Sequence, residues 1–324
     1  MIIKGIHHLS AHTASATSNH DFYTNVLGMR LVKKTVNQDS PSMYHLFYGD
    51  EVGNPGTELT FFEIPMMAST HKGTNSISNT SLRVSSDASL NYWQSRFQKY
   101  GVTHGEVTER AGHKILSFED PEGQRLTLVS DERNKGVKPG IAWDKSPVPK
   151  EHGITGLGPI RLTVRTAAAT AGILTEILGY KQTRSYASEA EDQPDILVFE
   201  TGEGGNGSEI HLEERRDLPV ERAGRGSVHH VAFRVDNEEE MLLWVKKIKA
   251  ARLPNSGFID RYYFRSLYFR EPNGILFELA TDGPGFATDE DIDHLGESLA
   301  LPPFLEPKRV EIEQKLTPIG NDMK

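Results

Sequence analysis

Gly274-Ile275-Leu276-Phe277-Glu278-Leu279 is a glycine followed by an apolar segment with the length and composition of a short strand. Segments of the same kind begin at Gly56, Gly123 and Gly207. The second and fourth of them follow related turns, Asp-Pro-Glu-Gly and Glu-Pro-Asn-Gly, in which proline fixes φ and glycine permits a positive φ. The chain therefore contains four copies of one turn-and-strand segment.

Upstream of each of these strands the sequence predicts an amphipathic helix. Apolar residues recur at helical spacing before Gly28, Gly101 and Gly179, and again within Met241–Ile248. A glycine just past the last apolar residue is typical of a helix C-terminus. Each helix follows a strand-like run, and these runs are residues 6–10, 81–84, 160–164 and 228–235. The predicted fold class is therefore α+β, with four βαβββ modules at a period of roughly seventy to eighty residues.

The modules predict two domains and a tail. The first pair of modules occupies residues 1–135, and the second pair occupies residues 158–285. Residues 136–157 belong to a stretch rich in lysine, proline and glycine without an apolar period, which predicts a linker. The C-terminal tail, residues 286–324, is expected to be partly helical from Pro307 to about Leu316. Such a tail either packs on the surface or lies over a functional site.

The composition excludes several classes of protein. The chain has 324 residues, a formal charge of −9 and no cysteine, so disulfides, thiolate nucleophiles and cysteine-held metal clusters are ruled out. The acidic balance argues against nucleic acid as a partner. No apolar run approaches the ~20 residues of a membrane span, and the N-terminus lacks the apolar core of a secretory signal. We expect a cytoplasmic protein without a membrane partner, in which any metal is held by His, Asp or Glu.

The four modules differ in the residues that could bind such a metal. At the start of the first strands they carry His8, Ser81, Arg161 and His230, and in the last strands they carry Thr60, Thr127, His211 and Glu278. If module one packs with module four, His8, His230 and Glu278 converge. Two imidazoles and one carboxylate on one face of an ion form the facial triad of non-heme Fe(II) enzymes. The short Thr60 would leave coordination positions open, as catalysis requires.

Each candidate also has a structural interpretation. A single inward histidine is usually a hydrogen-bonded core residue, and Glu278 in its apolar strand could instead pair with a buried arginine. The coincidence of three such residues at related positions favours the metal site. His7 and His229 precede the two candidate histidine ligands, so strand alternation predicts that they point away or toward a neighbouring strand, either orienting the ligands or filling the core. Tyr268 is either a packed aromatic or a proton donor. Other histidines, His45 among them, have no partner at an informative spacing.

The arrangement resembles the vicinal-oxygen-chelate superfamily of glyoxalases and extradiol dioxygenases over residues 1–280. Within it, the chain looks most like the bacterial hydroquinone ring-cleaving dioxygenases, the group associated with methyl-hydroquinone resistance and chlorohydroquinone breakdown. The segments that carry the resemblance are Gly5–His8, Tyr44–Thr57, Val228–Phe233, Tyr268–Gly274 and Gly283–Gly296.

This resemblance implies two half-closed barrel domains and a specific chemistry. His8, His230 and Glu278 would bind Fe(II), or alternatively Mn(II), while the remaining candidates would act beside the metal: His7, His229, Arg261 and Tyr268. The implied substrates are a small aromatic diol and dioxygen, and the ring would open next to a hydroxyl-bearing carbon. A homo-oligomer is compatible with the resemblance.

Two other functions remain open at this stage. One is a glyoxalase-like, metal-dependent isomerase or transferase, which would usually need a fourth ligand where this chain has Thr60. The other is a metal-free, aromatic-binding resistance protein of the same fold, which would not need the three ligand-type residues to coincide.

Overall fold

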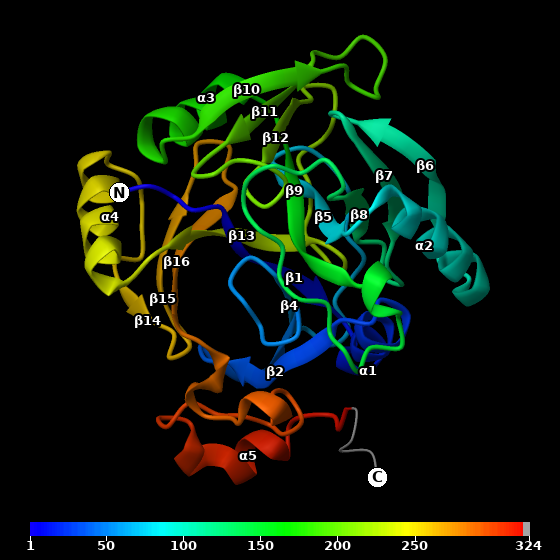
Figure 1. The fold of residues 1–324 in the computed structure, drawn as a ribbon. Coiled ribbons are helices and arrows are strands. Elements are labelled where there is room, and N and C mark those ends of the chain that lie inside the picture. Colours follow the sequence, from blue (N-terminus) through cyan, green and yellow to red (C-terminus); the bar gives the residue numbers. More distant parts are fainter. Residues whose placement is uncertain (320–324) are drawn as a thin grey trace.

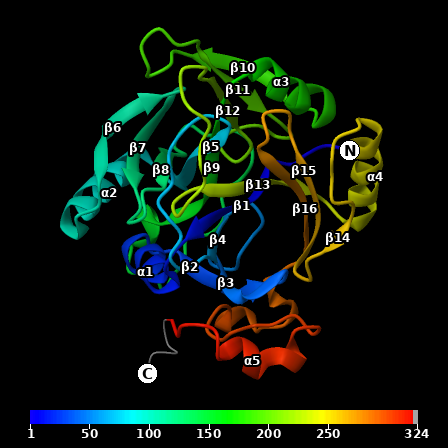
Figure 2. The ribbon, with the colours of Figure 1, turned by 180° about the vertical axis from the view of Figure 1, so that it is seen from behind.

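The strands of the protein form two curled, eight-stranded sheets (Figures 1 and 2). This arrangement is seen in a computed structural model that describes residues 1–319. The order in the first sheet is β14-β15-β16-β13-β1-β4-β3-β2, and the order in the second is β10-β11-β12-β9-β5-β8-β7-β6. The first sheet contains β1 (Ile6–Thr13), β2 (Arg30–Asn37), β3 (Ser40–Gly49), β4 (Glu58–Glu63), β13 (Val228–Val235), β14 (Ile259–Asp260), β15 (Phe264–Arg270) and β16 (Leu276–Pro284). The second contains β5 (Ser76–Val84), β6 (His104–Arg110), β7 (His113–Glu119), β8 (Arg125–Ser130), β9 (Ile154–Val164), β10 (Lys181–Tyr186), β11 (Ile196–Glu200) and β12 (Ile210–Glu214).

Module one therefore shares a sheet with module four, and module two shares a sheet with module three. The predicted α+β fold of four βαβββ modules in two half-barrels is confirmed. Each sheet contains strands from residues 1–135 and from residues 158–285. The division of the chain into these two domains stays a prediction. Hydrogen bonds join modules that are adjacent in the chain. Tyr23 donates a hydrogen bond of 3.2 Å to Asp120, and Thr170 donates one of 2.6 Å to Glu271.

One helix per module lies on the outside of its sheet (Figure 1). The helices are α1 (Ala16–Asp21), α2 (Asp87–Tyr100), α3 (Ala167–Gly172) and α4 (Glu238–Ala250), and α1 and α3 continue as the π-helical turns η1 (Phe22–Val26) and η3 (Ile173–Ile177). Their apolar faces are buried, as predicted. Gly28, Gly101 and Gly179 follow the first three helices with φ of 68°, 67° and 78°, a conformation that favours glycine. No helix in the described part of the chain is long and apolar enough to cross a membrane.

Each of the two central strands of the first sheet contains a bulge. β1 and β13 pair antiparallel, and the pairing skips His7 between Ile6 and His8 and skips His229 between His230 and Val228. A bulge inserts an extra residue, so that two consecutive side chains no longer alternate strictly between the faces of the sheet. Strict alternation therefore does not hold at His7 and His229, and of the two directions expected for these residues, His7 takes the one toward the neighbouring strand, where it contacts Glu58 of β4.

The register also corrects the alignment of the modules. In the first sheet, Glu278 lies beside Ala232, and Thr60 lies beside Ser10. In the second sheet, the counterpart of Glu278 is His211, which lies beside Arg161. The counterpart of Thr60 is Thr127, which lies beside Ser81. The residues that correspond to His8 and His230 are therefore Asn79 and Pro159, two positions before Ser81 and Arg161. A shift of two residues keeps the same face of a strand, so alternation could not detect it. The second sheet still lacks a comparable ligand set.

The C-terminal segment packs beneath β2 and away from the second sheet (Figure 1). It contains the short helical turns η4 (Phe286–Thr288), η5 (Ile292–His294) and η6 (Glu306–Lys308) and the helix α5 (Arg309–Glu313), while a further turn, η2 (Lys150–His152), lies in the predicted linker. The helix predicted from Pro307 is thus present, although shorter than expected. Lys33 of β2 is fully buried and is paired with Asp289 at 2.7 Å and with Glu290. This buried ion pair ties the segment to the first sheet.

A candidate metal centre in an aromatic cavity

His8, His230 and Glu278 lie together on the three central strands β1, β13 and β16. Nε2 of His8 is 3.3 Å from Nε2 of His230 and 3.1 Å from Oε2 of Glu278, and Nε2 of His230 is 2.8 Å from the same oxygen. All three side chains are buried. The strands on which they lie come from opposite ends of the chain, as expected if modules one and four share the site.

The two oxygens of the Glu278 carboxylate have different partners. Its Oε1 accepts a hydrogen bond of 2.6 Å from Ser266, whereas its buried Oε2 lies against the Nε2 atoms of His8 and His230. A buried carboxylate is costly unless its charge is balanced, and one cation between these three side chains would balance it. Ligands bound to one ion at ~2.1 Å and at right angles lie ~3 Å apart. The spacing of the three atoms fits such an ion.

The protonation states suit metal binding. Burial lowers the pKa of His8 to about 4, so its imidazole is neutral near pH 7. Burial also opposes the charge of Glu278, but His8 and His230 outweigh this effect and hold the pKa of that carboxyl well below its usual range. Metals bind neutral imidazoles and ionised carboxylates, so His8 and Glu278 are present in their binding forms.

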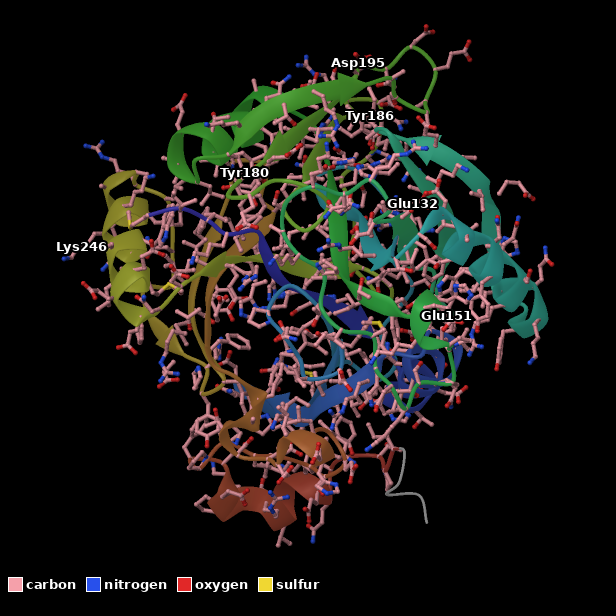
Figure 3. All side chains as sticks on the ribbon, in the orientation of Figure 1. Glu132, Glu151, Tyr180, Tyr186, Asp195 and Lys246 are labelled. Atoms are coloured by element: carbon pink, nitrogen blue, oxygen red, sulfur yellow. The ribbon has the colours of Figure 1, made fainter. Side chains whose placement is uncertain are left out.

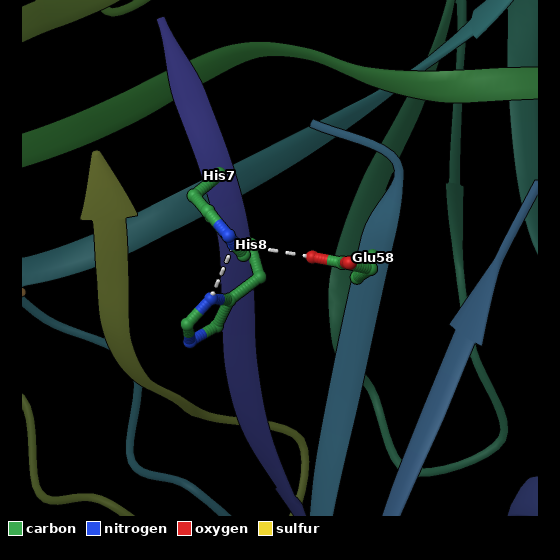
Figure 4. Close-up of side chains that lie close together, drawn as sticks. All are labelled: His7, His8 and Glu58. Carbon is green, nitrogen blue, oxygen red and sulfur yellow. Dashed lines mark hydrogen bonds and ion pairs between the residues drawn. The ribbon is translucent and has the colours of Figure 1, made fainter. Parts of the chain in front are cut away.

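The side chain of His7 contacts that of His8 and can fix its orientation (Figure 4). Nε2 of His7 lies 3.0 Å from the carbonyl oxygen of Thr281, which can only accept, so Nε2 carries the hydrogen. Nδ1 of His7 lies 3.0 Å from Nδ1 of His8. Oε2 of Glu58 lies 3.2 Å from the same His7 atom. Burial disfavours charge on His7, but Glu58 outweighs it and raises the pKa of His7.

His229 has the same relation to His230, on the cavity side. Their Nδ1 atoms are 2.7 Å apart, and His229 lines the cavity, where its side chain remains accessible to solvent. Burial and the neighbouring His230 lower the pKa of His229 to about 3, so its ring is neutral near pH 7. The two bulges thus give the two histidine ligands one partner each, His7 inside the protein and His229 beside the cavity.

Tyr268 and Arg261 approach from the hairpin of β15 and β16. Tyr268 lies directly opposite Glu278 in the sheet, with its ring centroid 5.7 Å from that of His230. The guanidinium of Arg261 is 5.5 Å from the centroid of the Tyr268 ring and pairs with Asp39 at 2.9 Å. Burial and the charge of Glu278 raise the pKa of Tyr268, so its phenol stays protonated near neutral pH and can donate a proton.

The metal centre forms one wall of a cavity of about 390 Å³. His45 lies in it between Phe47 and Phe62, with ring centroids 4.0 and 4.1 Å away, and its Nε2 is 2.9 Å from the hydroxyl of Thr60. The sequence did not single out His45, because Thr60 and Phe62, its partners on the neighbouring strand β4, are distant in the sequence. Its two-residue spacing from Phe47 on β3 indicates that both side chains lie on the same face of the sheet. The rings of His45, Phe47 and Phe62 give this wall of the cavity an aromatic surface.

The comparisons with known proteins identify the family. The model of the glyoxalase/bleomycin resistance protein/dioxygenase superfamily matches residues 5–128 and 156–279. The chain belongs to this superfamily. It is 57% identical to the Bacillus subtilis protein named "Putative ring-cleaving dioxygenase MhqA", over 98% of this chain and all of that one. It is 32% identical to the chlorohydroquinone/hydroquinone 1,2-dioxygenase of Sphingobium indicum, over 96% and 95% of the two chains.

A solved structure supports the same superfamily assignment. The crystal structure of a Bacillus subtilis protein described as a putative dioxygenase matches with a TM-score of 0.88 and 35% identity, covering 98% of both chains. The resemblance to ring-cleaving dioxygenases in the superfamily therefore extends over the whole described chain.

Proposed function

We propose that the protein is an Fe(II)-dependent ring-cleaving dioxygenase that opens hydroquinone-type rings next to a hydroxyl-bearing carbon. The observation that carries this proposal is the convergence of the buried Oε2 of Glu278 with the Nε2 atoms of His8 and His230 at the wall of an aromatic cavity. The names of the superfamily relatives support the same reaction class. Mn(II) is the alternative metal for this donor set.

The bound metal would supply a Lewis acid that lowers the pKa of a substrate hydroxyl and an open position for dioxygen. His45, Phe47 and Phe62 would hold the ring by stacking, which fixes the hydroxyl toward the metal centre. His229, neutral and accessible, would accept the proton of that hydroxyl. Tyr268 would donate a proton as the ring opens, and Arg261 would hold its phenol in place.

One observation argues against the glyoxalase-like alternative. The hydroxyl of Thr60, at the position of a fourth ligand, is already within 2.7 Å of Ser10 Oγ and 2.9 Å of His45 Nε2. A short side chain held in this way leaves the fourth corner open to substrate and dioxygen. We also place the reaction in the cytoplasm, where a reducing environment keeps iron ferrous.

The test is dioxygen uptake with methyl-hydroquinone by protein loaded anaerobically with Fe(II). We expect uptake that matches substrate loss and a ring-opened product in mass spectrometry. Glu278→Gln should lose bound iron and uptake while it keeps the fold by circular dichroism, because the amide keeps the size but removes the charge. Glu311→Gln, at an exposed glutamate that pairs with Lys315, serves as the matched control. Full activity without iron, or full iron content in Glu278→Gln, would overturn the proposal.

A further inference from the structure

The second half-barrel contains a cavity of its own, of about 610 Å³. Asn79, the counterpart of His8, lines it, but Pro159 and His211, the counterparts of His230 and Glu278, do not, so this cavity lies beside the place that corresponds to the candidate metal centre. The wall contains apolar residues, such as Phe118 and Leu126, together with several charged residues. The charged carboxylate and guanidinium residues in the lining are Arg110, Arg125, Arg161, Arg215, Glu119, Glu189 and Glu213.

Arg110 and Arg161 face each other across this cavity with little solvent around them. Their side chains are 15% and 13% exposed, and both contact Glu189, whose Oε1 is 2.6 Å from Nη2 of Arg110 and 3.6 Å from Nη2 of Arg161. Glu189 itself is 59% exposed and belongs to the loop between β10 and β11, which runs between Tyr186 and Asp195 (Figure 3). A mostly exposed carboxylate thus reaches inward to two mostly buried cations.

Glu189 is the carboxylate that Arg110 and Arg161 share. The other two arginines of the lining have carboxylate partners of their own, because Arg125 pairs with Glu221 and Arg215 pairs with Asp217. Burial and the neighbouring Arg161 lower the pKa of Arg110, as expected where cations are crowded together. An ion pair with a largely exposed partner contributes little, so an external anion can replace Glu189 at small cost.

We propose that this cavity binds a small organic carboxylate between Arg110 and Arg161, at the place that Glu189 occupies in the free protein. Paired guanidinium groups suit a planar carboxylate, to which they donate parallel hydrogen bonds. Phe118 and Leu126 contact the carbon chain of such a ligand better than they would a hydrated inorganic ion. The site requires no metal and is independent of the proposed dioxygenase reaction.

Calorimetric titration with adipate, a six-carbon dicarboxylate, tests the proposal. Glu189→Gln removes the internal competitor and should tighten adipate binding about fivefold. Arg110→Gln should weaken it about tenfold or more, because a charge-assisted hydrogen bond is lost. Arg216→Gln, at an arginine with a 72% exposed side chain outside the cavity lining, is the matched control and should bind as the wild type does. The uncharged diamide, adipamide, should not bind.

Three outcomes would overturn this assignment. Adipate that binds equally to the wild type and Arg110→Gln binds elsewhere, for example at the metal centre. An absence of binding in Glu189→Gln, in protein whose thermal unfolding is normal, means that the arginine pair takes no carboxylate. Inorganic phosphate that binds as tightly as adipate means that the cavity is a general anion site.

Discussion

At the scale of single residues, the two histidine pairs, His7–His8 and His229–His230, each combine one proposed metal ligand with one residue that contacts it. His8 and His230 present their Nε2 atoms to Glu278, and each is contacted at Nδ1 by the histidine that precedes it. Contacts of this kind fix the ring orientation and the tautomer of a ligand. The two pairs differ in their surroundings, because His7 faces Glu58 in the interior whereas His229 faces the cavity.

Substitutions of His229 and His230 should therefore have different effects. His230→Ala removes a donor atom, so iron content and dioxygen uptake should both be lost. His229→Ala should keep its iron and slow ring cleavage by ~10–100-fold, because residues that orient a ligand typically act on that scale. Iron stoichiometry measured beside oxygen consumption distinguishes the two. Iron lost from His229→Ala and kept by His230→Ala would reverse the assignment.

Tyr268→Phe tests the proton donor without disturbing the metal. The change removes only the hydroxyl, and the ring can still pack beside His230. We expect normal iron content, a similar KM and a kcat lower by ~10²-fold, in the range of general acid catalysis. Tyr262→Phe, at the neighbouring and more exposed tyrosine, is the control. An unchanged kcat in Tyr268→Phe would leave this residue with a packing role.

At the scale of strands and helices, some features of the site could be predicted from the sequence and others could not. The repeated strands and helices carry a strong period, so the four modules follow from the pattern, and the three residues proposed as ligands could be singled out although the alignment of the modules was two residues off. The bulges at His7 and His229 add one residue to a strand without changing its composition, so alternation could not detect them. His45 depends on the pairing of β3 with β4, which joins residues that are distant in the sequence.

The turn between β7 and β8 should make stability depend on pH. Burial raises the pKa of Asp120 from 3.8 to about 6. The folded state thus holds this proton more tightly than the unfolded state, so stability is highest below pH ~4 and falls by about 3 kcal/mol as the pH rises to ~6. Asp120→Asn keeps the acceptor for the amides of Glu122 and Gln124 and should remove this fall.

Urea unfolding of the wild type and Asp120→Asn at pH 4, 5, 6 and 7 measures this effect. Asp144→Asn, at an exposed position of the linker, is the control and should leave the pH profile as it is. An identical pH profile for Asp120→Asn and the wild type would show that the buried carboxyl is not responsible.

At the scale of the whole molecule, the C-terminal segment braces the cavity. Phe286 packs on Phe47 and Tyr263 with ring centroids 5.0 and 5.6 Å away, and both of these residues line the cavity. The hydroxyl of Tyr263 also donates to Asp289 at 2.8 Å. The segment was predicted either to pack on the surface or to lie over a site, and its contacts place it behind the wall of the cavity.

Lys33→Met should loosen this brace. The change removes a fully buried cation and leaves Asp289 and Glu290 without their partner, which costs on the order of 3 kcal/mol. We expect a lower free energy of unfolding and a higher KM, while iron binding in the folded protein persists. Lys72→Met, in an exposed pair with Glu119, should cost less than about 1 kcal/mol. Equal losses in the two variants would contradict this role of the segment.

The pairing of the first module with the last has a consequence for synthesis on the ribosome. His8 and His230 are 222 positions apart, and β1 has β13 as a neighbour in the finished sheet. At translation rates of ~5–20 residues per second, β1 leaves the ribosome ~10–40 seconds before that neighbour exists. The nascent chain therefore carries an unprotected strand edge through most of its synthesis, and the three metal ligands can meet only when translation is almost finished.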